Sequence, residues 1–113
     1  MTLPVLDIAS HLDVLRPVLG ARQLYAVRDP PAMVGLVFGP WSVGPCLRLA
    51  AAASPPEPVT VSVDVGTEFD ASYRRAVAMG ADIAEPPVEQ PWGMREFVLR
   101  LPDGHRLVVT GPA

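Results

Sequence analysis

The sequence predicts an α+β fold, in which two tandem βαβββ modules form curved mixed sheets around a cleft with the helices on the outside. Three observations predict it. The two halves of the chain match each other at a nearly constant spacing, each half contains an amphipathic helix that ends at a glycine, and strand-like segments flank each helix. With 113 residues, 50% of them hydrophobic, the chain can form one domain with a buried core.

The internal match is clearest at the glycines. Gly20 corresponds to Gly80, and Gly44 corresponds to Gly104 at the same spacing. Chance similarity in a chain rich in Ala and Val is the alternative, but the helix and strand patterns agree with the glycines and favour a duplication. We therefore expect one domain over residues 1–113, divided into module one (1–51), a linker (52–58) and module two (59–113).

In the first module, a strand over residues 3–7 precedes a helix over residues 11–19. Ser10, with Asp13 three positions later, predicts the N-terminal cap of that helix. Pro17 removes a backbone donor, so the helix is expected to be short or kinked. The remaining strands of this module are predicted over residues 23–28, 34–38 and 46–51.

In the second module, residues 59–65 alternate Val with Thr, Ser and Asp, which predicts a strand with one buried face. Thr67 and Asp70 resemble a capping box at the start of a helix over residues 68–79. The apolar residues at helical spacing that we expect on its buried face are Phe69, Tyr73, Ala76 and Val77. The remaining strands are predicted over residues 84–88, 95–101 and 106–110.

The last hairpin carries the most specific pattern in the chain. Residues 91–97 read Pro-Trp-Gly-Met-Arg-Glu-Phe, and residues 102–104 read Pro-Asp-Gly, a turn in which Pro fixes φ and Gly accepts a positive φ. This spacing is similar to the C-terminal signature of the vicinal oxygen chelate superfamily, which includes glyoxalase I, extradiol dioxygenases and bleomycin-resistance proteins. Duplicated βαβββ modules are the organisation of that family, so the resemblance extends over essentially the whole chain.

The resemblance implies positions for a divalent metal, with His or Gln early and Glu late in each module. The early positions fall on Thr60 and near Leu3 or Pro4, and the late positions fall on Val108 and Arg48. Divalent ions of this kind require imidazole or carboxylate donors. We therefore expect no metal and no cofactor, and the chain resembles most closely the metal-free, bleomycin-resistance-like binding proteins.

Other groups of catalytic type are few. His11 is expected to face solvent early on a helix, and His105 is expected to be exposed at the start of a strand. Cys46 is expected to be a small buried hydrophobe, because nothing beside it in the sequence would lower its pKa. Arg95 is expected to form a structural ion pair, with Glu89 or Glu96 as its partner.

The implied cleft can be assigned from strand alternation. If Thr60 faces it, the polar residues two and four positions later also face it, and the valines between them form core. The aromatic residues offer flat apolar faces for stacking, although Trp41 and Trp92 could equally plug the ends of the sheets, and Tyr25 and Phe38 could equally be core. The expected ligand-binding residues are Trp92, Trp41, Arg48, Phe38, Ser62, Thr60, Asp64, Val108, Tyr25 and Thr110.

Composition restricts the partners. The chain has 9 basic residues, all of them Arg, and 12 acidic ones, giving a net charge of −3 without a basic stripe, so a nucleic-acid partner is not expected. The absence of Lys and the 14 Pro are typical of a GC-rich genome. A single cysteine and no apolar segment of signal-peptide or membrane-spanning type predict a cytoplasmic protein.

The leading functional hypothesis is a non-catalytic protein that sequesters a hydrophobic or aromatic natural product or antibiotic, as in self-resistance. The resemblance implies a homodimer with exchanged halves, whose cleft is shared between chains. One alternative is a metal-independent isomerase or cyclase of natural-product biosynthesis, with Asp64 as general base and Arg48 as oxyanion partner. A second alternative is a metal-dependent glyoxalase- or dioxygenase-like enzyme, if the register of the metal positions differs.

Overall fold

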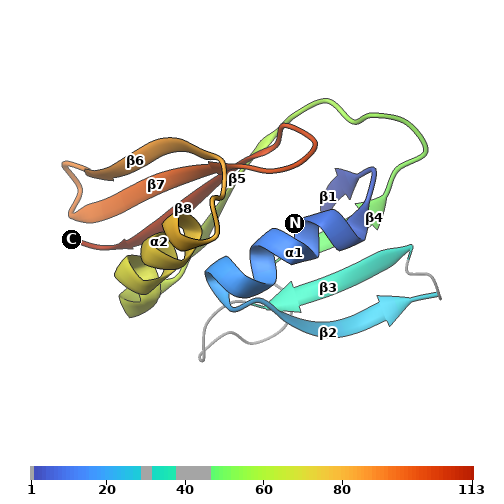
Figure 1. Ribbon diagram of the computed structural model, residues 1–113, viewed down its shortest axis with the longest axis horizontal. Coiled ribbons are helices and arrows are strands. Elements are labelled where there is room, and N and C mark those ends of the chain that lie inside the picture. Colours follow the sequence, from blue (N-terminus) through green and yellow to red (C-terminus); the bar gives the residue numbers. More distant parts are fainter. Residues whose placement is uncertain (1, 29–31, 38–46) are drawn as a thin grey trace. The chain divides into compact units, whose positions relative to one another are not determined.

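Two helix-and-sheet modules make up the computed structural model, which describes residues 2–28, 32–37 and 47–113 (Figure 1). The chain divides into two compact units, residues 1–57 and 58–113, and the described residues of each have the order βαβββ. The first unit contains β1 (Thr2–Val5), α1 (Ile8–Leu19), β2 (Arg22–Val27), β3 (Met33–Val37) and β4 (Leu47–Ala51). The second unit contains β5 (Thr60–Asp64), α2 (Phe69–Ala78), β6 (Ile83–Glu89), β7 (Met94–Arg100) and β8 (Arg106–Pro112). The predicted fold class is confirmed.

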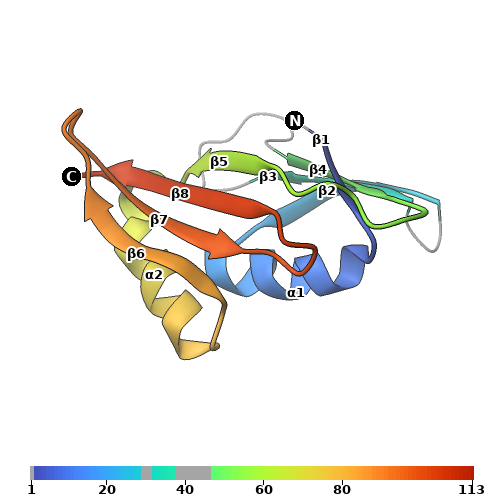
Figure 2. The ribbon, with the colours of Figure 1, turned by 90° about the horizontal axis from the view of Figure 1, so that it is seen from above.

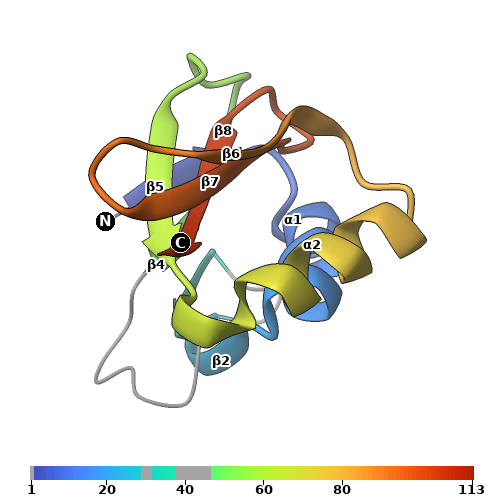
Figure 3. The same ribbon diagram turned by 90° about the vertical axis from the view of Figure 1, so that its left-hand side faces the viewer.

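Both sheets have the same topology. The strand order is β1-β4-β3-β2 in the first and β5-β8-β7-β6 in the second. In each sheet the first strand of the module pairs in parallel with the last strand, and the other pairs are antiparallel. Each helix lies against one face of its own sheet (Figures 2 and 3). The other face of each sheet, which we call its open face, is not covered by the helix of that module.

The first helix begins earlier than the sequence predicts. Asp7, and not Ser10, is the N-cap, and its Oδ1 accepts a hydrogen bond from the backbone N–H of Ala9 at 3.1 Å. The hydroxyl of Ser10 instead donates to the carbonyl of Asp7. The helix continues past Pro17, which lies on its exposed side, and runs to Leu19, so the expectation of a short helix is wrong. Gly20 ends it with φ of 64°, as the sequence predicts.

The second helix departs from its predicted cap. A 3₁₀ turn over Gly66–Glu68 leads into α2, and neither N-cap is bonded by a side chain, so the predicted capping box of Thr67 and Asp70 does not form. Of the four residues expected on the buried face, Phe69 and Ala76 are buried and Tyr73 is half-buried. Val77 is 54% exposed, because it follows Ala76 and the helix turns by about 100° per residue.

The core of each module lies between the helix and its sheet. In the second module, Phe97 meets the rings of Phe69 and Tyr73 edge to face, at centroid distances of 5.4 and 5.3 Å. The strand residues that the alternation predicts as core are buried in both modules: Leu47, Leu49, Val61, Val63, Leu107 and Val109.

Both histidines are buried, which contradicts the sequence-based expectation for each. His11 lies on the inner side of α1, where its Nδ1 is 2.8 Å from the carbonyl oxygen of Asp7, one turn earlier. His105 Nδ1 accepts a hydrogen bond of 3.0 Å from the backbone N–H of Val59. Each imidazole therefore satisfies a backbone group in the interior, which accounts for its burial.

Candidate functional site

The open face of the second sheet begins at β5. Thr60, Ser62 and Asp64 are exposed, whereas Val61 and Val63 between them are buried against the helix side. The strict alternation of a strand therefore places the three polar side chains on the open face. This confirms the facing that the sequence predicts for this strand.

The pairing register extends that assignment across the sheet. One row of paired positions runs through Asp64, Thr110, Glu96 and Val88, from β5 to β6. The neighbouring row runs through Ser62, Val108, Val98 and Glu85. Residues paired in this way point to the same face, so the open face has valines at its centre and carboxylates beside them.

A groove of about 370 Å³ lies on this face between β6 and β7. Its position follows from Pro86 and Pro87, which have no N–H to donate to the ladder of the edge strand. The register between the two strands shifts on either side of Glu85, so β6 does not pair regularly with its neighbour. The residues that line the groove are Glu85, Pro86, Val88, Gln90, Glu96 and Val98.

The charged groups of the groove differ in their partners. Glu85 Oε2 lies 3.1 Å from the guanidinium of Arg106, and both side chains are substantially exposed. Such an exposed pair adds little stability, about 0–1 kcal/mol, but it balances the charge of Glu85. Among the residues that the structure describes, no ion pair or hydrogen bond involves the carboxylate of Glu96.

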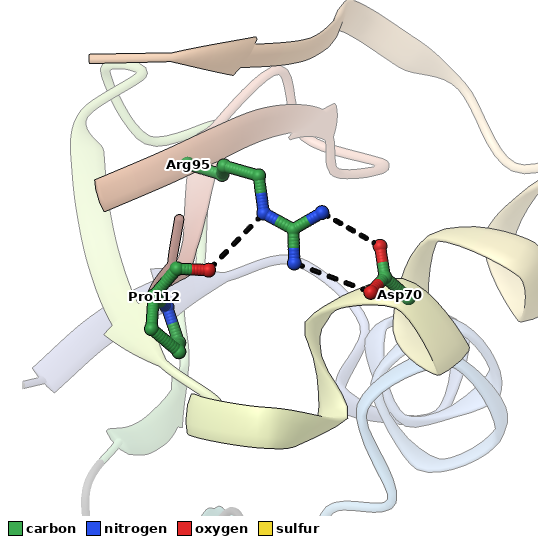
Figure 4. A network of polar contacts seen from close by, with 3 residues as sticks. All are labelled: Asp70, Arg95 and Pro112. Carbon is green, nitrogen blue, oxygen red and sulfur yellow. Dashed lines mark hydrogen bonds and ion pairs between the residues drawn. The ribbon is translucent and has the colours of Figure 1, made fainter. Parts of the chain in front are cut away.

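Arg95, next to Glu96 on β7, points to the opposite face of the sheet. Its guanidinium binds both carboxylate oxygens of Asp70, at 2.8 and 3.2 Å, and its Nε donates to the carbonyl of Pro112 (Figure 4). It also lies 4.6 Å from the ring centroid of Phe69. The expected ion pair therefore forms, but its partner is Asp70 rather than Glu89 or Glu96. The hydrogen bond from Arg95 lowers the pKa of Asp70.

The open face of the first sheet is shaped by Gly35. The ring of Tyr25 lies so close over this glycine that a Cβ there would collide with it. In the strand register Gly35 is flanked by Tyr25 on β2 and by Arg48 on β4, so the aromatic ring and the guanidinium share one face. Arg48 is exposed, and Tyr25 is 38% exposed.

The structure therefore places the predicted ligand-binding residues in three groups. Thr60, Ser62, Asp64, Val108 and Thr110 lie on the open face of the second sheet, and Tyr25 and Arg48 lie on that of the first. Trp92 is 66% exposed in the turn between β6 and β7, so it does not plug the end of the sheet. Phe38, Trp41 and Cys46 lie outside the described residues.

Two of the polar candidates also serve the backbone. Asp64 Oδ1 accepts a hydrogen bond of 2.9 Å from the N–H of Gly66, which fixes the turn into α2. The hydroxyl of Thr110 donates to the carbonyl of Val63 at 3.3 Å. Both side chains are thus held in position at the margin of the open face.

None of the six residues that line the groove was among the expected ligand-binding residues: Glu85, Pro86, Val88, Gln90, Glu96 and Val98. The sequence pattern of β7 does indicate the facing of two of them, Glu96 and Val98. Phe97 and Leu99 are apolar residues in alternating positions of β7, which assigns Glu96 and Val98 to the other face. The irregular pairing of β6 has no comparable local pattern.

The metal positions implied by the family do not suit a cation. Thr60 and Val108 lie on the second open face and Arg48 on the first, while Leu3 is fully buried. A hydroxyl, an isopropyl group and a guanidinium do not form a donor set for a divalent ion. Within residues 2–28, 32–37 and 47–113, no three His, Cys, Asp or Glu residues come together as a possible metal site.

Neither helix of the described residues is long and apolar enough to cross a membrane.

The chain is similar to one family model and to several solved structures. The model of the Glyoxalase/Bleomycin resistance protein/Dioxygenase superfamily matches residues 1–109. No curated protein gives a significant match in sequence. TioX from Micromonospora sp. ML1 is 24% identical, with a TM-score of 0.80 over 100% of this chain and 96% of that one.

Two further structures share the fold. A glyoxalase/bleomycin resistance protein/dioxygenase from Nocardioides is 22% identical, with a TM-score of 0.66 over 99% of this chain and 80% of that one. The fosfomycin resistance protein FosX from Listeria monocytogenes is 17% identical, with a TM-score of 0.69 over 100% of this chain and 90% of that one. Identities this low establish a common fold and leave the ligand to be argued from the site.

Proposed function

Because the chain belongs to the glyoxalase/bleomycin resistance protein/dioxygenase superfamily, we propose that it is a non-catalytic binding protein that sequesters a hydrophobic or aromatic small molecule. The ligand class is a natural product or antibiotic, and the role is self-resistance. The whole of residues 1–113 acts as one binding domain, with residues 52–58 joining its modules. FosX, a fosfomycin resistance protein, has the same fold, which supports an antibiotic as ligand.

The observation that carries this proposal is the composition of the open face of the second sheet. Val88 and Val108 present apolar surface beside a groove, where the family's metal position is apolar. Apolar burial contributes about 25 cal/mol per Å² before the cost of ordering the ligand, so a flat aromatic body is a suitable occupant. Trp92, exposed at the neighbouring turn, adds a stacking surface.

The proposal includes a second set of contacts from the first module. Tyr25 supplies an aromatic ring and Arg48 a fixed positive charge on the same open face. Phe38 and Trp41, for which the structure gives no position, are proposed as further aromatic contacts. We place the protein in the cytoplasm as a homodimer with exchanged modules, so that each binding cleft contains residues of both chains.

One observation favours an enzymatic alternative. The carboxylate of Asp64 is exposed on an open face, where a general base of a metal-independent isomerase or cyclase would lie, with Arg48 as the oxyanion partner. Its Oδ1 already accepts a hydrogen bond from the N–H of Gly66, so part of the carboxylate serves the turn into α2. We therefore rank binding above catalysis. A metal-dependent reaction would require donors at other positions.

Calorimetric titration with planar aromatic antibiotics tests the proposal. We expect stoichiometric uptake by the wild type and weaker uptake by Trp92→Ala and Arg48→Ala. Asp82→Ala serves as a matched surface control, because Asp82 lies just before β6, does not line the groove and binds Arg100. No uptake by the wild type, or equal uptake by all four proteins, would contradict a binding role at these residues. Turnover of the bound compound would favour the enzymatic alternative.

A further inference from the structure

We propose that the groove between β6 and β7 binds the cationic end of an amphipathic small molecule, a protonated amine carried on a flat apolar body. This inference rests on the proposed function, because it assigns a charge to the ligand of the same open face. The groove combines apolar lining residues, Val88 and Val98, with a carboxylate, that of Glu96, which has no cationic partner among the described residues. That combination favours a ligand with one apolar and one positively charged part.

The apolar part of the site is made by valines. Val98 and Val88 both line the groove; Val98 is 4% exposed and Val88 is 53% exposed. Val108 continues the apolar surface, since it is the partner of Val98 in the adjacent strand. A flat ring placed over Val88 and Val108 would remove apolar surface from water, since these two valines, unlike Val98, are not buried.

The negative charge within the groove is that of Glu96. Asp64 lies outside the groove but in the same row of the sheet, with Thr110 between them on β8. Neighbouring strands are about 4.8 Å apart, so two residues separated by one strand lie about 10 Å apart. An ammonium group in the groove would therefore interact mainly with Glu96, and the more distant Asp64 would add little because salt screens charges at about this separation.

The positive side chains on the same face have carboxylate partners other than Glu96. Arg106 binds Glu85, the other carboxylate of the groove, at 3.1 Å, and Arg100 binds Asp82 at 3.2 Å. On the opposite face Arg95 is held by Asp70. Among the described residues that line the groove, the carboxylate without a cationic partner is that of Glu96.

The selection among ligand charges follows from desolvation. A neutral ligand in the groove would remove water from the Glu96 carboxylate without replacing its hydrogen bonds, and an anionic ligand would add repulsion. A protonated amine provides an N–H donor and an opposite charge at the same position. Specificity for a cation therefore arises as much from rejecting the other two classes as from attracting this one.

Three acridines of matched shape test this inference. They are 9-aminoacridine, which is cationic at neutral pH, acridine, which is largely neutral there, and acridine-9-carboxylate, which is anionic. Dissociation constants are measured for the wild type, for Glu96→Gln and for Glu89→Gln. The last variant is the control, because Glu89 is an exposed carboxylate of the same hairpin that pairs with Arg95 in register and so points to the helix side.

We expect the wild type to bind the cation more tightly than the neutral acridine, and the anion least. Glu96→Gln should weaken binding of the cation by about 3- to 10-fold, the range of a charge-assisted contact at a partly exposed site. It should bind the neutral acridine slightly more tightly, because an amide costs less to desolvate than a carboxylate, and Glu89→Gln should change neither. Addition of salt should reduce the preference for the cation in the wild type.

The other outcomes would contradict the charge of the ligand, its place in the groove, or the binding function. Equal binding of all three acridines, unaffected by Glu96→Gln, would leave the binding function intact and remove the cation assignment. A preference for the cation that survives in Glu96→Gln, or that Glu89→Gln abolishes equally, would remove the assignment to this groove. No binding of any acridine would contradict both the inference and the proposed function.

Discussion

Arg95 holds Asp70 with both arms of its guanidinium, so that one bidentate contact ties the first turn of α2 to strand β7. The two N···O distances are 2.8 and 3.2 Å, and the residues are 25 positions apart in the chain. The same guanidinium donates from Nε to Pro112, near the C-terminal end of β8. One side chain therefore fastens a helix start and two strands on the helix side of the sheet, away from the groove.

Replacing Asp70 should lower stability in a pH-dependent way. Because Arg95 lowers the pKa of Asp70 in the folded protein, the ion pair stabilises the fold above the ordinary aspartate pKa, about 3.9. The contribution is lost as the pH falls through the lower, folded-state pKa. We expect Asp70→Asn to unfold at lower urea concentration than the wild type at pH 7.

The difference between Asp70→Asn and the wild type should narrow as the pH is lowered below about 4. Urea midpoints measured between pH 7 and pH 2.5 check this. Asp82→Asn, which alters the exposed pair of Asp82 with Arg100, is the matched control. A difference that is constant over the whole range would show that Asp70 contributes through its shape and not through its charge.

Gly111 should not tolerate a side chain. It lies in β8 on the helix side, where a Cβ would come within 2.6 Å of Phe69 Cβ and 2.9 Å of the carbonyl oxygen of Gly66. The second of these neighbours is backbone and cannot rotate away. We expect Gly111→Ala to cost about 1–3 kcal/mol in the free energy of unfolding, the usual range for overpacking.

The adjacent position provides the comparison for Gly111. Thr110 faces the open side of the sheet, so Thr110→Ala loses one hydrogen bond to Val63 without creating a collision. Its cost should be about 0.5–1.5 kcal/mol, smaller than that of Gly111→Ala. Equal costs in chemical denaturation would mean that the strand moves to accommodate the added methyl group.

The buried His105 should behave as a structural acceptor. Its Nδ1 receives the backbone N–H of Val59, and its side chain has no exposed surface. Replacing it by Leu removes the acceptor and leaves that N–H unsatisfied, which costs about 1–3 kcal/mol. His105→Asn retains an oxygen near the Nδ1 position and should lose less, as measured by thermal unfolding. A His105→Leu variant as stable as the wild type would contradict this role.

The faces of the strands could be predicted from the sequence because they depend on local alternation. Val61 and Val63 are buried, and Thr60 and Ser62 are exposed, as the two-residue period requires. The positions at which the two helices end, Gly20 and Gly80, could also be predicted. They depend on a local property, the ease with which glycine adopts a positive φ.

The features that the sequence did not reveal depend on distant residues. His105 is buried because Val59, 46 positions earlier, provides its hydrogen bond. Asp70 binds Arg95 in place of capping its own helix, and those residues are 25 positions apart. The groove arises where β6 loses its register with β7, which no single segment encodes.

The fluorescence of Trp92 should report directly on occupation of the open face. This side chain is 66% exposed in the turn that follows Gln90, a residue of the groove. The sequence contains two tryptophans, so Trp41→Phe leaves Trp92 as the single indole emitter. In that variant we expect emission typical of an exposed indole, which shifts to shorter wavelength when a non-absorbing, cationic aromatic ligand covers the ring.

Benzylamine is a suitable probe for this shift. The double variant Trp41→Phe/Glu96→Gln should require a higher benzylamine concentration than Trp41→Phe for the same shift. An emission maximum that does not move while calorimetry records binding would remove Trp92 from the contacts of the ligand and leave the valines of the groove as its apolar surface.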